Sequence, residues 1–232
     1  SASPCSSSAR CGSSTQWLAR VGMENFLISI HYNAWILHAL LILPLVGAAA
    51  VFVTPKAQAR YLALIITTVE FLLSLGLWWS LNTDSGTMEL VTTVPWIPQW
   101  GISYAVGMDG ISLMMVLLTT LLMPLCVLGS FNYITDREPA FYGLLVALTT
   151  GMVGVFIAMD MFLFYVFWEL MLIPMYFLIG VWGGKNRLYA ALKFFIYTMA
   201  GSLLMLVAIL VMVRVAAVMS GGTVSFSYFH LL

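Results

Sequence analysis

Long apolar runs, separated by short polar connections, repeat along most of this chain. Each run has about twenty residues, which at 1.5 Å per residue of helix is enough to cross a hydrocarbon core of roughly 30 Å. The pattern therefore predicts an all-α integral membrane protein with about six transmembrane helices, forming one transmembrane domain over residues 23–232. The expected helices are Ala34–Val53, Tyr61–Ser80, Gly110–Phe131, Ala140–Met159, Met161–Trp182 and Leu188–Val213.

The connections between these runs predict how the chain sits in the membrane. The longest one, residues 81–109, contains TTVPWIPQWGISYAVGMDG, in which apolar and polar positions alternate. We expect a short hairpin in this external loop between the second and third helices, with Trp96 and Trp100 at the headgroup level. Connections with Lys or Arg alternate with connections that have none, so the positive-inside rule places Lys56, Arg137 and Arg187 on the cytoplasmic or matrix side.

Residues 1–22 differ from the rest of the chain. They are rich in serine, contain Arg10 and Arg20, and have no acidic residue, which is typical of a mitochondrial transit segment. Met23, however, opens MENFLIS as an initiator methionine would. We therefore favour an unstructured extension upstream of the folded chain over an organelle-targeting leader.

The composition supports a membrane protein and excludes several other classes. Hydrophobic residues make up 62% of the chain and charged residues 8%, whereas soluble domains carry roughly 25% charged residues. Nine basic and nine acidic residues balance, so nothing favours nucleic acid, and the expected partners are lipid and other membrane helices. Cys5, Cys11 and Cys126 fit neither a metal site nor a disulfide framework. Nucleotide, CxxC and zinc-protease motifs are absent from the sequence, so we expect no cofactor in this chain.

A single carboxylate, Glu169, stands near the middle of the apolar stretch DMFLFYVFWELMLIPMYFLIGVWGG. An ionised carboxylate in hydrocarbon costs several kcal/mol, so a chain accepts one there only with a partner, a proton or a function. Five residues later, Pro174 lacks an N–H group and frees the carbonyl of Leu170, which makes the neighbourhood polar. We favour proton carriage for Glu169 over a purely structural hydrogen bond.

Other ionisable residues are weaker candidates for proton translocation. Lys193 is near the start of the sixth helix, where snorkelling to the interface and a buried relay role remain equally open. Glu70 is as deep in the second helix as Glu169 is in the fifth, but it has no adjacent proline. His38 in the first helix is expected to be a packing residue.

Two aspartates and three small residues have expected structural roles. Asp109 should cap the third helix, and Asp160 is expected to be a solvated turn residue that also caps the fifth. Gly143, Ala147 and Gly151 recur every four residues in the fourth helix, which allows another helix or subunit to approach closely.

The segments FWELMLIPMYFLIGVWG, ALKFFIYTMAGSLLMLVAIL and MDGISLMMVLLTTLLMPL together are specific. Through them, from about Trp35 to the end, the sequence resembles the M subunit (chain 4) family of proton-translocating NADH:quinone oxidoreductase, respiratory complex I. The resemblance implies that Glu169 is the family's essential helix-five glutamate and that Lys193 is the helix-six lysine of bacterial members. It also implies a translocase subunit of the membrane arm, with proton translocation coupled to electron transfer from NADH to quinone.

The resemblance also implies what lies outside this chain. NADH, FMN, iron–sulfur clusters and quinone are expected in other subunits of the complex, and the partners are other membrane-arm subunits. The expected location is a bacterial inner membrane, with the mitochondrial inner membrane as the alternative. In the family the glutamate pairs with a lysine in the seventh helix. Because this sequence ends at Leu232, we expect another chain to carry the C-terminal half, and no pumping by this chain alone.

Three alternatives remain open from the sequence. The same fold could belong to a multisubunit sodium/proton antiporter, in which neither quinone nor NADH takes part. The chain could also be a structural membrane subunit that only braces its neighbours. An isolated channel is disfavoured because no helix carries a polar stripe.

Overall fold

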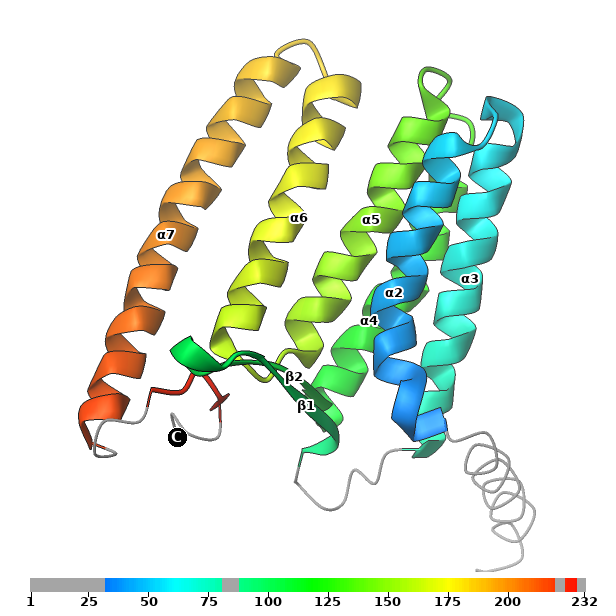
Figure 1. The fold of residues 1–232 in the computed structure, drawn as a ribbon. Coiled ribbons are helices and arrows are strands. Elements are labelled where there is room, and N and C mark those ends of the chain that lie inside the picture. The colour runs from blue at the N-terminus through cyan, green and yellow to red at the C-terminus, as the bar shows by residue number, and fades with distance from the viewer. Residues whose placement is uncertain (1–31, 81–87, 220–223, 229–232) are drawn as a thin grey trace, which may run out of the picture.

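The computed structural model describes residues 32–80, 88–219 and 224–228. The expected extension over residues 1–22 lies outside these ranges. Six helices in the described part are long and apolar enough to cross a membrane, as the sequence predicts. They lie side by side and roughly parallel to one another (Figure 1). They are α2 (Tyr32–Val53), α3 (Lys56–Ser80), α4 (Gly110–Ser130), α5 (Glu138–Ile157), α6 (Met161–Trp182) and α7 (Arg187–Met219).

Two helix boundaries differ from the apolar runs by more than two residues. Helix α3 begins at Lys56 rather than Tyr61, directly after Pro55, whose carbonyl accepts a hydrogen bond from the Gln58 N–H at 3.0 Å. Helix α7 continues six residues past Val213 and includes the exposed Arg214. In both cases polar residues limit the apolar run but not the helix: residues 56–60 before the run in α3, and Arg214 after it in α7. A helix satisfies its own backbone hydrogen bonds in water as well as in lipid.

The connection between α3 and α4 contains the expected hairpin. Strand β1 (Glu89–Ile97) pairs antiparallel with strand β2 (Ile102–Met108), and a short 3-10 helix, η2 (Pro98–Trp100), joins them. Gly101 has a φ of 68°, a left-handed conformation that favours glycine. The hairpin crosses one end of the helices, which we call the hairpin end (Figure 1). Trp96 and Trp100 are exposed there, and their position at the headgroup level stays a prediction.

The α5–α6 turn is held at the hairpin end by Asp160. Its Oδ1 accepts hydrogen bonds from the N–H groups of Phe162 at 2.9 Å and Leu163 at 3.2 Å, which confirms the predicted cap. Its Oδ2 accepts a third from Ser103 of β2 at 3.0 Å. Asp160 is 1% exposed, so the expected solvated position is wrong. Strand β2 and residues 224–228 cover this turn, and no local pattern around Asp160 predicts that cover.

Asp109 and the small residues of α5 behave largely as expected. The Asp109 carboxylate caps α4 by accepting a hydrogen bond from the Ser112 N–H at 2.7 Å. Gly143 faces Phe52 of α2, and Gly151 faces Met171 of α6, in each case with too little space for a Cβ atom unless the neighbour moves. The small residues therefore let two different helices of this same chain approach α5.

The helices form two unequal groups. Helices α2 to α5 enclose the larger buried clusters, while α6 packs against α5 and α7 packs along α6 (Figure 1). A smaller cluster joins the hairpin-end part of α7 to the hairpin and to Phe226. Much of the remaining α7 surface is apolar and exposed, including Ile196, Leu204 and Val211. This surface is suited to lipid or to further membrane helices.

Candidate functional site

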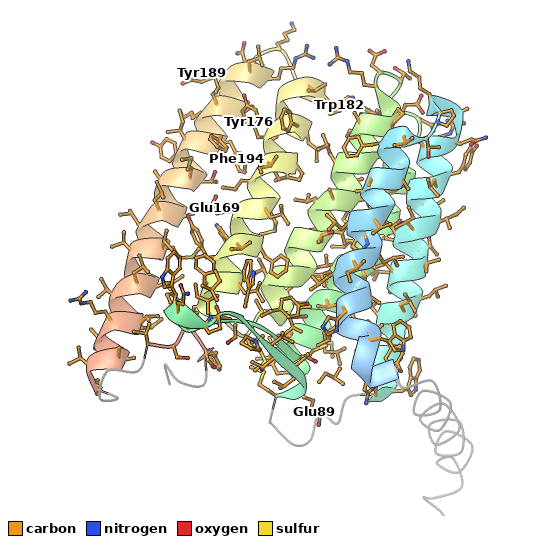
Figure 2. All side chains as sticks on the ribbon, in the orientation of Figure 1. Glu89, Glu169, Tyr176, Trp182, Tyr189 and Phe194 are labelled. Atoms are coloured by element: carbon orange, nitrogen blue, oxygen red, sulfur yellow. The ribbon has the colours of Figure 1, made fainter. Side chains whose placement is uncertain are left out.

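Glu169 lies between α6 and α7, on the side of α6 that faces its neighbour (Figure 2). It comes eight residues after Met161, so it is about 12 Å from the hairpin end of the helix. The Ser202 hydroxyl of α7 donates a hydrogen bond to its Oε1. Tyr165, one turn earlier on α6, interacts with both Glu169 and Ser202. Three polar side chains from two helices thus meet at membrane depth.

Ser202 has a second acceptor within reach. It is only 3% exposed, and its Oγ lies 3.0 Å from the carbonyl oxygen of Met199 in the preceding turn of α7. A hydroxyl has one proton and two lone pairs, so it donates one hydrogen bond and accepts others. When Glu169 is ionised, Ser202 donates to it. A protonated acid at this position can donate to Ser202 Oγ, with the serine proton then directed to the Met199 carbonyl.

The register of α6 and α7 fixes what else lies near Glu169. A Cβ added at Gly180 would be 3.5 Å from the Ala191 Cβ, and the rings of Tyr176 and Phe195 have centroids 5.5 Å apart. These pairs, together with Glu169 and Ser202, follow a constant antiparallel register along the two helices. Pro174 lies five residues beyond the acid, and α6 continues as one helix across it.

Lys193 does not join this site. It is exposed, and its ammonium nitrogen lies 5.9 Å from the centroid of the Tyr189 ring. The α6–α7 register places it level with Leu178, nine residues from Glu169, which corresponds to roughly 13 Å along the helix axis. The structure therefore brings Glu169 together with Ser202 and leaves Lys193 nearer the opposite end of the helices.

Glu70 occupies a second and quite different polar position. It is fully buried in α3, and neither carboxyl oxygen has a hydrogen-bond partner among the described residues. One turn later, Ser74 Oγ lies 2.7 Å from Thr120 Oγ1 of α4. The Ser74–Thr120 pair lies between α3 and α4, and Glu70 is one helical turn from Ser74 on α3. Glu70 is thus more enclosed than Glu169, which the sequence alone does not indicate.

His38 lies outside both of these polar positions. The His38 ring is half-buried, with its centroid 5.7 Å from that of Tyr104, and this agrees with the expected packing role. The residues that the structure describes contain no group of three His, Cys, Asp or Glu side chains able to hold a metal ion.

Sequence reasoning missed Ser202 and Tyr165. A serine inside an apolar helix usually bonds to its own preceding turn, so its type and spacing do not reveal a partner on another helix. The available signal is that Tyr165 precedes Glu169 by one helical turn and so shares its face. The position of Ser202 depends on the rotation of α7 against α6, which no local pattern sets.

Two known family patterns match the chain. Residues 39–155 match the amino terminus of NADH-ubiquinone oxidoreductase chain 4. Residues 158–231 match the transmembrane region of the NADH:quinone oxidoreductase/Mrp antiporter family. Together these matches cover most of the described helices.

Similar proteins agree with this result. The NADH-quinone oxidoreductase subunit M of Escherichia coli (strain K12) is 42% identical over 207 residues, which are 83% of this chain and 40% of that protein. A chain of respiratory complex I from Thermus thermophilus with bound NADH is 29% identical, with a TM-score of 0.69 over 84% of this chain and 38% of that one. A chain of the Mrp complex from Dietzia sp. DQ12-45-1b, 21% identical with a TM-score of 0.66, shares the fold.

This chain therefore spans about 40% of the length of the curated relative that it matches. Its helices and its relatives make it a multi-pass membrane protein, and the bacterial relatives support the predicted bacterial inner membrane. By the match over residues 39–155, the chain belongs to the NADH:quinone oxidoreductase subunit M (chain 4) family.

Proposed function

We propose that this chain takes part in proton translocation in the membrane arm of an NADH:quinone oxidoreductase, and that Glu169 carries the proton. The observation that supports this most directly is the Glu169–Ser202 pair and its link to the Met199 carbonyl. A carboxyl group that exchanges a proton needs hydrogen bonds in both protonation states, because an unpaired polar group at membrane depth costs several kcal/mol. Rotation of one serine hydroxyl supplies them.

The electron-transfer chemistry belongs to other parts of the complex in this proposal. NADH, FMN, iron–sulfur clusters and quinone are bound by other subunits, and this chain carries out no redox step. Free energy from quinone reduction reaches Glu169 through a change in the packing of α7 on α6, which alters the distance between the acid and its hydrogen-bond donors. A further chain or segment supplies the remaining helices and the cation that the family resemblance implies.

Lys193 has a secondary role in the proposal, and Glu70 is the weakest candidate. Lys193, exposed near the end of α7 that begins with Arg187, helps protons to enter or leave at the membrane surface and does not pair with Glu169. Glu70 is enclosed and has no hydrogen-bond partner among the described residues, so we expect it to take no part in proton exchange. Both assignments rest on surroundings that differ from those of Glu169: Lys193 is exposed, and Glu70 has no hydrogen-bond donor beside it among the described residues.

The test substitutes Glu169 in the assembled complex and measures NADH-driven proton transport into proteoliposomes. Glu169→Gln keeps the shape and hydrogen-bonding capacity of the side chain but cannot exchange a proton, so we expect assembly to survive and most acidification to be lost. Glu169→Asp titrates and should retain part of the activity. Glu138→Gln, the same change at the first residue of α5, is the matched control and should behave as wild type.

Wild-type transport by the Glu169→Gln complex, with assembly shown on a native gel, would leave Glu169 as a structural hydrogen-bonding residue. Such a result favours the structural alternative, in which this chain only braces its neighbours.

The antiporter alternative has its own support. Residues 158–231 match a family that includes Mrp antiporters, and the fold is shared with a chain of an Mrp complex. In that case the chain exchanges sodium for protons and no quinone is involved. Purification of the native complex decides between the two: iron–sulfur subunits should accompany this chain if the oxidoreductase assignment is correct, and should be absent from an antiporter.

A further inference from the structure

A polar cavity of about 710 Å³ opens at the end of the helices opposite to the hairpin. Its lining includes three cationic side chains: Lys56, the first residue of α3; Arg137, which precedes α5; and Arg187, the first residue of α7. A single carboxylate, Asp136, lines the cavity with them. Three segments far apart in the sequence thus bring an excess of positive charge to one place.

The three cationic side chains keep N–H groups that can bind a ligand. The Arg187 guanidinium donates one hydrogen bond, to the Val181 carbonyl at 2.9 Å, and keeps further N–H groups for a ligand. Lys56 and Arg137 are both exposed. Like charges gathered without matching acids repel one another, and an anion relieves that repulsion. The N-termini of α3, α5 and α7 add positive dipole ends on the same side.

Part of the lining is apolar, and these side chains suit a lipid rather than a free ion. Val181, Trp182 and Leu188 line the same cavity, and Trp182 Nε1 donates a hydrogen bond to the Asp136 carbonyl at 2.8 Å. The Trp182 ring packs edge-on against the Phe141 ring, with the two centroids 5.3 Å apart. Tryptophan with its N–H group satisfied and its ring against other apolar groups is typical of the headgroup level of a membrane. The cavity is also at the ends of helices that are long enough to cross the membrane.

We propose that this cavity binds the phosphate headgroup of an anionic phospholipid. The lipid comes from the leaflet at the end of the helices opposite to the hairpin, where the three cations lie. Lys56, Arg137 and Arg187 hold the phosphate oxygens, and the acyl chains leave along the exposed apolar surface beside α6 and α7. Basic pockets between transmembrane helices on the cytoplasmic or matrix side are suited to such headgroups. The proposal is independent of the role of Glu169.

The test uses the whole complex, stripped of lipid in detergent, with lipid retention followed by native mass spectrometry. We expect phosphatidylglycerol to bind and phosphatidylcholine of the same acyl composition not to compete. The variant combines Lys56→Gln with Arg137→Asn. It leaves the Arg187 hydrogen bond to α6 intact, and asparagine tolerates the left-handed φ of 53° at position 137. Lys185→Gln, in the adjacent α6–α7 connection, removes a charge that does not line the cavity and is the control.

Removal of two cations should weaken phosphatidylglycerol binding by roughly tenfold to thirtyfold, while the control stays at the wild-type value. Equal weakening in the variant and the control, or equal binding of phosphatidylcholine, would overturn the proposal. The cavity would be a free-ion site instead if the complex retained no phosphatidylglycerol but bound inorganic phosphate. That result would also overturn the proposal. A wild-type complex that takes up no phosphatidylglycerol after lipid removal would contradict the proposal too. Such a result would mean that a neighbouring protein segment fills the cavity.

Discussion

Glu169 and Glu70 are both carboxylates at mid-helix positions, yet the structure gives them opposite surroundings. Glu169 is half-buried between α6 and α7, with Ser202 donating to it and Tyr165 beside it. Glu70 is fully buried on α3 and has no hydrogen-bond partner among the described residues. Depth along a helix is therefore a poor guide to what an acidic residue does.

The difference concerns which protonation states the surroundings can accommodate. At Glu169, one serine hydroxyl can donate to the carboxylate or accept from the protonated acid, with the Met199 carbonyl as its other partner. At Glu70, an ionised side chain would be a buried charge without a hydrogen bond, which is among the most costly arrangements in a protein. Exchange of a proton therefore suits Glu169 at the α6–α7 interface better than Glu70 in its buried position on α3.

After the loss expected for Glu169→Gln, the largest effect should come from Ser202. Ser202→Val keeps most of the volume but removes the hydroxyl, so Glu169 loses its donor when ionised and its acceptor when protonated. Hydrogen bonds to charged groups are worth about 1.5–3 kcal/mol, so we expect NADH-driven proton transport to fall on the order of tenfold or more. The measurement is proton transport at equal amounts of assembled complex.

Ser202→Thr is the matched control, since it retains the hydroxyl. It should transport protons far better than Ser202→Val. Equal activity of the two variants would mean that the Ser202 hydroxyl does not support proton exchange at Glu169.

A smaller effect is expected at Lys193. Its ammonium group is exposed and roughly 13 Å from Glu169 along the helix, so solvent and headgroups screen its charge. We expect Lys193→Ala to lower proton transport by roughly a factor of two to five, and Lys193→Arg to restore most of it. A loss as complete as that of Glu169→Gln would instead assign Lys193 to the buried relay.

The smallest effect on transport is expected at Glu70. Glu70→Gln should pump like the wild type, because a group held in one protonation state takes no part in exchange. Glu70→Leu removes an unpaired buried polar group, so the temperature at which the complex dissociates, followed on native gels after heating, should stay the same or rise. Loss of transport in both variants, with intact assembly, would place Glu70 on the proton path.

The sequence predicts the helices well where physical signals coincide. The bounds of α6 match its apolar run, since Asp160 caps its start and two glycines follow Trp182. The end of α7 was missed because Arg214 ends the apolar run but not the helix. The hairpin was predictable from alternation and turn residues, whereas the burial of Asp160 depends on β2 and on residues 224–228.

The candidate site was only partly predictable, because some of its contacts come from residues far apart in the sequence. Glu169 stands out because a charge in an apolar run is costly wherever the neighbours lie. Ser202 and the isolation of Glu70 depend on how helices rotate against one another, and this is set by packing along their whole length. Single-sequence patterns describe one helix at a time and do not contain that information.

Infrared difference spectroscopy of the assembled complex, with and without NADH, tests most directly whether Glu169 rather than Glu70 exchanges a proton. Loss or gain of a proton by a carboxyl group changes the C=O stretching band of the protonated acid. We predict that the wild type and Glu70→Gln show such a band change on reduction, and that Glu169→Gln lacks it. A band change that persists in Glu169→Gln and disappears in Glu70→Gln would contradict the assignment of the proton to Glu169.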